Sequence, residues 1–201
     1  MKTLESHINE ALKIGKDISK FSTYAYIPTS KKELQDIIKI RIKKEGNNCN
    51  LNDIDVSLIE DMSYLFYKST FNGDISKWNT SNVTNMYSMF AYSKFNGNIS
   101  DWDTSNVKFM GWMFANSEFN GDISGWNVSN VKYMEWMFNR SVFNKDISNW
   151  DVSKVEDMEC MFRESDFNKD ISNWNIHKCN TNRMFKNKSI KDSYKPKSLQ
   201  R

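Results

Sequence analysis

Five tryptophans recur at a spacing of 24 residues, and this period constrains the fold more than any other feature of the sequence. They are Trp78, Trp102, Trp126, Trp150 and Trp174. Phenylalanines keep the same spacing from Phe71 to Phe167, and so does the V-x-x-M-x-x-M-F segment that begins at Val83. A strict period of this length is typical of a solenoid, in which each unit buries its apolar face against its neighbours. The sequence therefore predicts one stacked array with no second core.

Each 24-residue unit changes its hydrophobic period halfway. In the segment FNGDISKW, Phe71, Gly73 and Ile75 alternate with the polar residues Asn72, Asp74 and Ser76, as in a short strand. From Val83 to Phe90 the apolar residues fall at i, i+3, i+6 and i+7, which predicts a short helix with one apolar face. The expected fold is an α/β repeat solenoid, with parallel strands on one face and short helices on the other.

The flanks of the array divide the chain into three parts. The pattern runs over residues 47–185. Residues 1–46 are expected to form an N-terminal helical cap, because the capping-box pair Ser30 and Glu33 precedes an amphipathic run that predicts a helix from Lys31 to Lys44. A weaker helix is predicted near Leu4 to Ile18. Residues 186–201 have the makeup of a basic, frayed C-terminal tail.

The repeat signature F-N-x-D-I-S-x-W-[ND]-x-S-x-V-x-x-M-x-x-M-F resembles the BspA-like repeats of bacterial surface proteins and lipoproteins. The resemblance covers about two thirds of the chain. It implies a leucine-rich-repeat-like solenoid and a role in binding other proteins or matrix components. The sequence has neither the secretion signal nor the lipid-attachment cysteine of the surface-exposed members, and Cys49, Cys160 and Cys179 form no disulfide or zinc pattern. A cytoplasmic, reducing location is therefore expected.

Charge is unevenly distributed along the chain. Lys and Arg number 10 against 6 Asp and Glu in residues 1–50, 12 against 18 in 51–185, and 6 against 1 in 186–201. An acidic array argues against binding of nucleic acid along the repeats, because that affinity comes largely from Lys and Arg on phosphates. Binding of nucleic acid at the two basic ends stays open.

Residues that break the repeat are the best candidates for a partner-binding site. On the predicted helix, the position of residue 88 faces away from the core, and its occupants include Tyr64, Trp112 and Trp136. Exposed large aromatics favour interfaces, although helix tilt or a dimer could cover them. The expected partner-binding residues are Tyr64, Tyr87, Trp112, Trp136, Tyr92, Arg140 and Arg163.

Other chemistry has little support in the sequence. Aspartates recur with the repeat at Asp74, Asp122, Asp146 and Asp170. Their spacing lacks the clustered oxygens of a calcium loop, so turn capping is the favoured role. The two histidines, His7 and His177, have no nucleophile at a motif spacing beside them, and a thiol site of His177 with Cys179 is disfavoured against a cap role.

These observations predict a non-enzymatic protein-binding module that has no cofactor and no metal. An alternative of a different kind is an intracellular inhibitor, encoded by a phage or another mobile element, that blocks a host defence enzyme. A second alternative is nucleic-acid binding through the basic termini. The predicted partner is a protein, with no membrane association, and the oligomeric state stays open.

Overall fold

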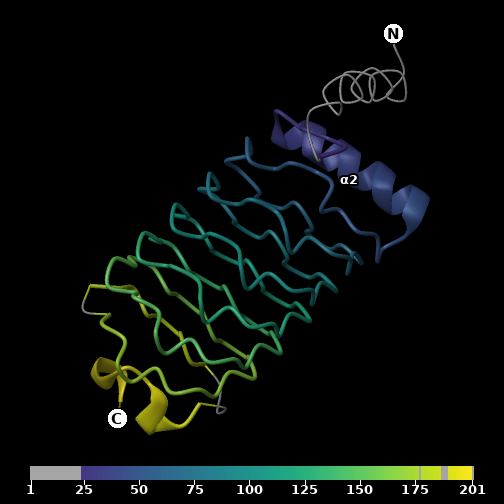
Figure 1. Ribbon diagram of the computed structural model, residues 1–201. Coiled ribbons are helices and arrows are strands. Elements are labelled where there is room, and N and C mark those ends of the chain that lie inside the picture. Colours follow the sequence, from purple (N-terminus) through teal and green to yellow (C-terminus); the bar gives the residue numbers. More distant parts are fainter. Residues whose placement is uncertain (1–23, 177, 187–189, 201) are drawn as a thin grey trace.

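The chain forms an elongated solenoid in which successive 24-residue units, here called rungs, lie side by side (Figure 1). The computed structural model describes residues 24–176, 178–186 and 190–200. Helix α2, Lys31–Glu45, lies at one end of the stack, and the C-terminal segment lies at the other. The predicted repeat solenoid is confirmed at this level.

Backbone hydrogen bonds join each rung to the next along one segment, which we call the turn face: residues 60–68, 84–92, 108–116, 132–140 and 156–164. Alternate N–H groups donate to the following rung, as from Met86 to the carbonyl of Phe109 (2.9 Å) and from Phe90 to that of Met113 (2.9 Å). The N–H groups between them donate within the rung, as from Met89 to the carbonyl of Met86 (3.2 Å). Backbone polar groups in a packed stack are thereby paired without a regular helix.

The helices predicted for the repeats are wrong. In the described chain, the V-x-x-M-x-x-M-F segments are successive tight turns, and α2 is the one α-helix. Two residues in each turn face have φ between 52° and 60°, the left-handed region. They are Tyr64, Lys68, Ser88, Tyr92, Trp112, Asn116, Trp136, Arg140, Cys160 and Glu164. A left-handed residue every four positions coils the chain into turns, which place the methionines and phenylalanine inward just as a helix would.

The predicted parallel strands are also wrong in detail. The described residues contain isolated parallel bridges, such as Asn50 with Asp74 and Asn85 with Phe109, and no strand. The Phe71–Trp78 segment pairs through its backbone, as from the Asp74 N–H to the Cys49 carbonyl (3.2 Å), whereas in its later copies an asparagine side chain provides the link between rungs. The Asn96 N–H donates to Oδ1 of Asn72 at 2.8 Å, and the same bond links Asn120, Asn144 and Asn168 to the rungs before them.

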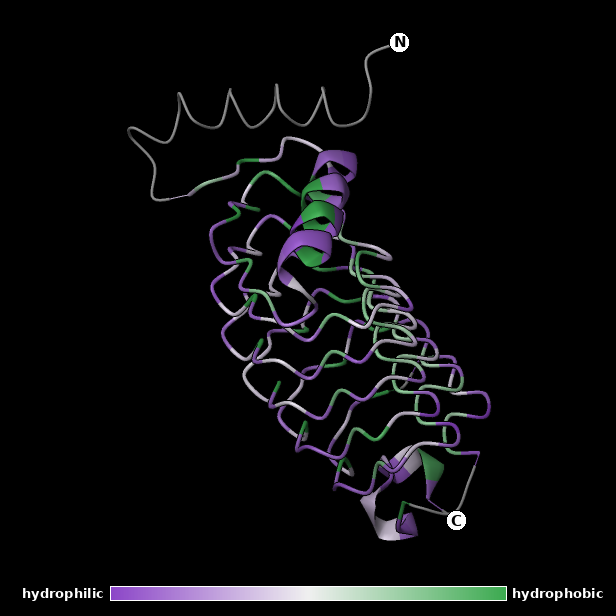
Figure 2. Ribbon diagram, turned by 90° about the vertical axis from the view of Figure 1, so that its right-hand side faces the viewer, coloured by the Kyte–Doolittle hydropathy of each residue, from purple (hydrophilic) through white to green (hydrophobic). Residues whose placement is uncertain are grey.

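The core consists of columns of identical side chains. The rings of Phe90 and Phe114 stack with centroids 5.7 Å apart, and those of Trp78 and Trp102 lie 6.2 Å apart. All these rings are buried. Figure 2 shows hydrophobic and hydrophilic residues alternating along the flattened rungs. Because each unit finds its apolar partner in the next unit, stacking is what buries the core.

Helix α2 covers the first rung, and its prediction is confirmed to within one residue. Ser30 caps its N-terminus by accepting from the Glu33 N–H at 3.3 Å. Leu34, Ile37 and Ile38 are buried against the stack. The predicted helix near Leu4 to Ile18 lies outside the described residues. Among those residues, no helix has the length and apolar character needed to cross a bilayer.

The described part of the predicted frayed tail, residues 186 and 190–200, instead packs against the last rung. The Ile171 N–H donates to the Tyr194 carbonyl at 2.9 Å. The Lys191 N–H donates to Oδ1 of Asn168 at 3.1 Å, which extends the series of asparagine hydrogen bonds between rungs, here called the asparagine series. Ile190 is buried, and Leu199 packs on the core. Two short 3-10 helices, η1 (Asp192–Tyr194) and η2 (Lys197–Leu199), complete this end.

Candidate functional site

The turn face holds the predicted partner-binding residues, but their exposure differs from the prediction. Tyr64 and Tyr92 are exposed (49% and 44%), while Trp112 and Trp136 are half-buried. Ser88, at the same repeat position, is buried, and so is Cys160. The prediction that this position faces water was therefore wrong as a rule, because turns with left-handed residues do not follow the 100° step of a helical wheel.

Four tyrosines gather at the N-terminal end of the turn face. The Tyr64 ring lies 5.6 Å from those of Tyr67 and Tyr87, and the Tyr67 ring lies 5.8 Å from that of Tyr92. The Lys68 ammonium lies 5.1 Å from the Tyr67 centroid. Burial raises the pKa of the Tyr87 hydroxyl, with Tyr64 and Glu135 adding to the effect. Sequence reasoning missed Tyr67, whose signal was that alanine stands at its place in the next two rungs.

The two tryptophans form the next part of this surface. The indoles of Trp112 and Trp136 stack with centroids 4.8 Å apart and planes 10° from parallel. The Arg163 guanidinium lies 5.6 Å from the Trp136 centroid, so the structure brings together three of the predicted residues. Another predicted residue, Arg140, donates to Glu164 at 2.6 Å. The pair is rigid because each indole supports the other.

A second aromatic pair, Phe109 and Tyr133, was missed by sequence reasoning. Their rings stack at 5.4 Å, and Phe109 is 39% exposed. The other rungs have Asp or Asn here, as in Asn85, whose Oδ1 accepts from the Tyr87 N–H at 3.0 Å. Replacing a turn-capping residue by an aromatic ring in two adjacent rungs was the available signal. We call the eight rings Tyr64, Tyr67, Tyr87, Tyr92, Phe109, Trp112, Tyr133 and Trp136 the aromatic patch.

A glutamate lies within the aromatic patch. The Glu135 carboxyl is placed over Gly111, one rung earlier, so that a Cβ built on Gly111 would be 2.3 Å from Oε1. Oε2 is buried and has no hydrogen-bond partner. Burial raises the pKa of the Glu135 carboxyl, and the negative charge of Asp157 adds to the rise. The patch therefore includes a partly buried acid whose charged form is poorly solvated.

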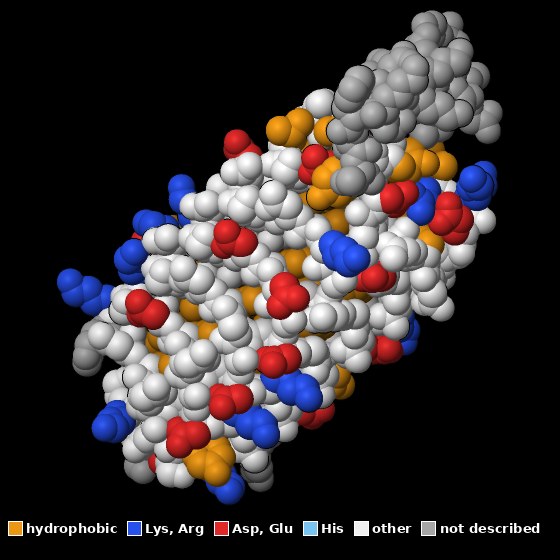
Figure 3. Space-filling model, in the orientation of Figure 1, with side chains coloured by type: hydrophobic (Ala, Val, Ile, Leu, Met, Phe, Trp, Pro, Cys, Tyr) orange, Lys and Arg blue, Asp and Glu red, His pale blue; other side chains and the backbone are white. Residues whose placement is uncertain are grey.

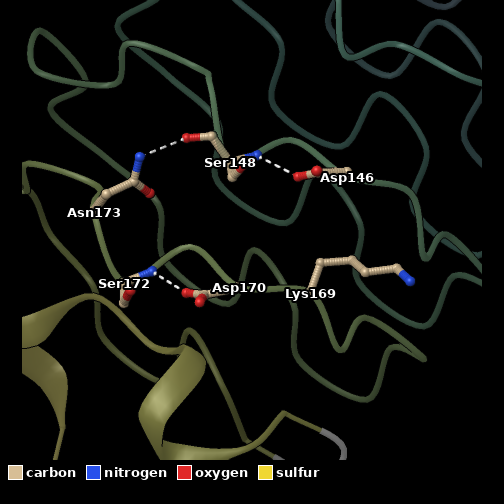
Figure 4. Close-up of a pocket in the computed structure, with 6 residues that line it drawn as sticks. All are labelled: Asp146, Ser148, Lys169, Asp170, Ser172 and Asn173. Atoms are coloured by element: carbon tan, nitrogen blue, oxygen red, sulfur yellow. Dashed lines mark hydrogen bonds between the residues drawn. The ribbon is translucent and has the colours of Figure 1, made fainter.

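The repeated aspartates cap turns, as predicted. Figure 4 shows two of them beside an open depression of about 310 Å³: Asp146 accepts from the Ser148 N–H, and Asp170 accepts from the Ser172 N–H, both at 2.9 Å. These backbone bonds lower the pKa of both carboxyls. Lys169 points away from the bonded groups (Figure 4). In the described chain, no group of three or more His, Cys, Asp or Glu side chains is arranged to hold a metal ion.

The thiols are placed as structural residues. Cys160 is buried, and burial raises its pKa. Burial also raises the pKa of Cys179 to about 12, with Asp157 contributing, so its reactive thiolate is disfavoured at neutral pH. Its proposed companion His177 lies outside the described residues, as does His7.

The side of the molecule seen in Figure 3 has acidic and basic groups scattered among uncharged polar ones, with hydrophobic side chains visible in small areas between them. This surface has no long tract of one charge. The aromatic patch is therefore the more distinctive candidate for recognition.

One comparison with known proteins identifies a relationship. A family model described as "Mycoplasma protein of unknown function, DUF285" matches residues 36–141 and 115–195, two overlapping copies that together span most of the chain. No curated protein and no solved structure gives a match.

Proposed function

Since the chain belongs to the DUF285 family of repeat proteins, we propose that it is a non-enzymatic module that binds a protein partner through one rigid surface of its solenoid. The observation that carries this proposal is the aromatic patch. Eight aromatic side chains occupy variable positions of the turn face, where the repeat itself does not require them. Tyrosine and tryptophan are the residue types most enriched at interface hot spots.

Rigidity supports the same proposal. From residue 84 onward, each turn-face segment is hydrogen-bonded to the rungs on both sides, and the two tryptophans are already stacked in the free protein. A surface that is ordered before binding loses less conformational entropy when the partner arrives. Arg140 and Arg163 lie at the edge of the patch and supply the polar rim of a typical interface.

The resemblance to BspA-like repeats is part of the proposal. By that resemblance the partner is another protein or a matrix component. The two alternative hypotheses predict a different partner, either a host enzyme or a nucleic acid. Capture from a lysate of the source cell distinguishes these three kinds of partner.

The test compares three versions of the full chain. The Trp112→Ser, Trp136→Ser double variant removes the centre of the patch, and the Leu58→Ser, Val142→Ser double variant removes two exposed apolar side chains outside it (57% and 44% exposed). We expect both to melt within a few degrees of the wild type. We expect the wild type and the control to capture the same protein and the tryptophan variant to lose it.

The captured protein is then purified and titrated against the three versions, so that binding is measured between two defined components. Equal affinity for wild type and tryptophan variant would contradict the proposal. A large fall in the melting temperature of the tryptophan variant would show that the indoles belong to the core, which would also contradict it.

A further inference from the structure

Three ion pairs on and beside the turn face share one arrangement. A basic side chain in one rung pairs with a glutamate 24 residues later, in the next rung. The pairs are Lys94 with Glu118, Lys132 with Glu156, and Arg140 with Glu164. Each of these glutamates therefore has its counter-charge one rung before it.

Glu135 has no such counter-charge in the rung before it. The residue 24 positions earlier is Gly111, and no ion pair among the described residues includes Glu135. Its carboxyl nevertheless reaches back by one rung and lies over the Gly111 backbone. One oxygen is buried without a partner. A buried carboxylate oxygen left unpaired is costly, so a cation supplied from outside would gain a strong partner here.

The surroundings of this carboxyl favour a flat cation. Tyr133 lies two residues before Glu135 and Trp136 directly after it. Their rings stack on Phe109 and Trp112 of the preceding rung, at 5.4 Å and 4.8 Å respectively. The patch already holds one guanidinium, that of Arg163, 5.6 Å from the Trp136 centroid. Arginine stacks on aromatic faces and donates two parallel hydrogen bonds to a carboxylate, which an ammonium group does not.

We propose that Glu135 is the anchor for an arginine side chain of the protein partner, whose guanidinium pairs with the carboxylate above Gly111 and lies against the aromatic patch. This inference rests on the proposed function and names the chemistry of the partner. Glu135 is partly exposed, and the terminal torsion of a glutamate is soft, so a small rotation presents both oxygens to the incoming group.

Gly111 is the second half of the site. The backbone there has no positive φ, so an alanine is conformationally allowed. The alanine methyl group would occupy the position of the Glu135 carboxyl, and the carboxyl can move away because it is the end of a flexible side chain. Gly111→Ala thus displaces the carboxylate while it leaves the charge in the protein.

The test uses a short peptide with one arginine among glycines, and the same peptide with citrulline, the neutral isostere. We expect the arginine peptide to shift the NMR signals of the Gly111 amide and the Trp112 indole N–H in a saturable way. Citrulline should bind about tenfold more weakly or worse, because the charge-assisted pair is lost. Glu135→Gln and Gly111→Ala should weaken binding of the arginine peptide to a similar degree.

The matched control is Glu159→Gln, which changes the same position one rung later, where Asn182 already lies 3.5 Å from the carboxyl. This variant should bind the arginine peptide like the wild type. Equal binding of the citrulline peptide, or full binding by Glu135→Gln, would overturn the inference.

The failure of this inference can be distinguished from failure of the proposed function. If the arginine peptide does not bind while the tryptophan variant still loses its protein partner, the proposed function is supported and the arginine anchor at Glu135 is contradicted. If the peptide binds at Glu135 while capture ignores the tryptophans, the proposed function falls.

Discussion

The indole Nε1 of Trp126 donates a hydrogen bond of 3.0 Å to the carbonyl oxygen of Ile99, which lies 27 residues earlier in the preceding rung. The same bond recurs at all five tryptophans of the period, at 2.9 to 3.2 Å. Each tryptophan thus fills the core and also supplies a second donor to a carbonyl of the preceding rung, since the Ile99 carbonyl already accepts from the Trp102 N–H at 3.3 Å. This double role explains why the position is tryptophan in every full copy.

Trp126→Phe is expected to lower the free energy of unfolding by about 1 to 3 kcal/mol, because the Ile99 carbonyl loses the shorter of its two hydrogen bonds and the smaller ring leaves space in the core. Urea denaturation measures the change. Trp112→Phe, at a half-buried position on the turn face, serves as control and should cost clearly less. Equal losses would contradict the structural role of the indole N–H.

Asn120→Ala is expected to cost about 1 to 2 kcal/mol, because Oδ1 of Asn120 accepts from the partly buried Asn144 N–H at 2.9 Å. Asn120→Asp keeps an acceptor there and should cost less. Asn149→Ala removes an exposed inter-rung bond to the Ser124 carbonyl and should cost about 0.5 kcal/mol. Denaturation of the three variants should rank them in this order, and the opposite ranking would argue against the asparagine series as a main link between rungs.

Lys68 has a left-handed φ of 55° and exposes its side chain, so its substitution tests backbone strain. Asn116 holds the same position two rungs later with φ 52°. Both Lys68→Asn and Lys68→Val remove the ammonium from the Tyr67 and Tyr92 rings, so their difference isolates the backbone: the valine variant should be less stable than the asparagine variant by about 1 to 2 kcal/mol. Thermal unfolding compares the pair. Valine as stable as asparagine would rule out a left-handed conformation here.

Acid should destabilise the array through its turn-capping aspartates. Backbone N–H bonds lower the pKa of Asp74, Asp122, Asp146 and Asp170. Their stabilising contribution is therefore present above the ordinary pKa of aspartate, about 3.9, and is lost as the pH falls through the lower folded pKa. The melting temperature should drop across this range.

The control for this acid effect is a variant with asparagine at all four positions. Asn98 already stands at the equivalent place and accepts from the Ser100 N–H at 3.0 Å. The variant should therefore melt close to the wild type at pH 7 and show a smaller drop in acid. A drop of the same size would assign the acid sensitivity to other groups.

The effect of Glu135 on stability should change with pH in the direction opposite to that of the aspartates. Because burial raises its folded pKa, its contribution is most favourable below the ordinary pKa of glutamate and is lost as the pH rises through the folded value. At neutral pH the charge is a cost, so Glu135→Gln should raise the melting temperature at pH 7 and leave it nearly unchanged in acid. A lower melting temperature at pH 7 would mean that the carboxylate has a stabilising partner within the chain.

The period, the buried columns and helix α2 could be predicted from the sequence because each depends on spacing alone. The turns could not. Met86, Met89 and Phe90 point inward in a helix and equally in successive turns, and the left-handed residues that decide between them, such as Tyr64 and Trp136, are not glycines. Bulky residues in this conformation are uncommon, so no local rule signals it.

The candidate site was predictable in part. Tyr64, Trp112 and Trp136 stand out as departures from the repeat, and the structure places them on the turn face. Glu135 was missed because its meaning depends on Gly111, which is distant in sequence and adjacent only once rungs are in register. The cap formed by Ile190 and Tyr194 was missed for a similar reason, since a short basic tail has no periodic signal.

The asparagine series has a consequence for how such a chain can change in length. In this series, Oδ1 of each asparagine accepts a hydrogen bond from the backbone N–H of the next asparagine, 24 residues later: the acceptors are Asn72, Asn96, Asn120 and Asn144. At the end of the stack, Oδ1 of Asn168 accepts from the Lys191 N–H. An inserted or deleted copy would therefore meet the same acceptors and donors as the original. The number of copies, and with it the length of surface offered to a partner, is free to vary by duplication while both closing segments stay as they are.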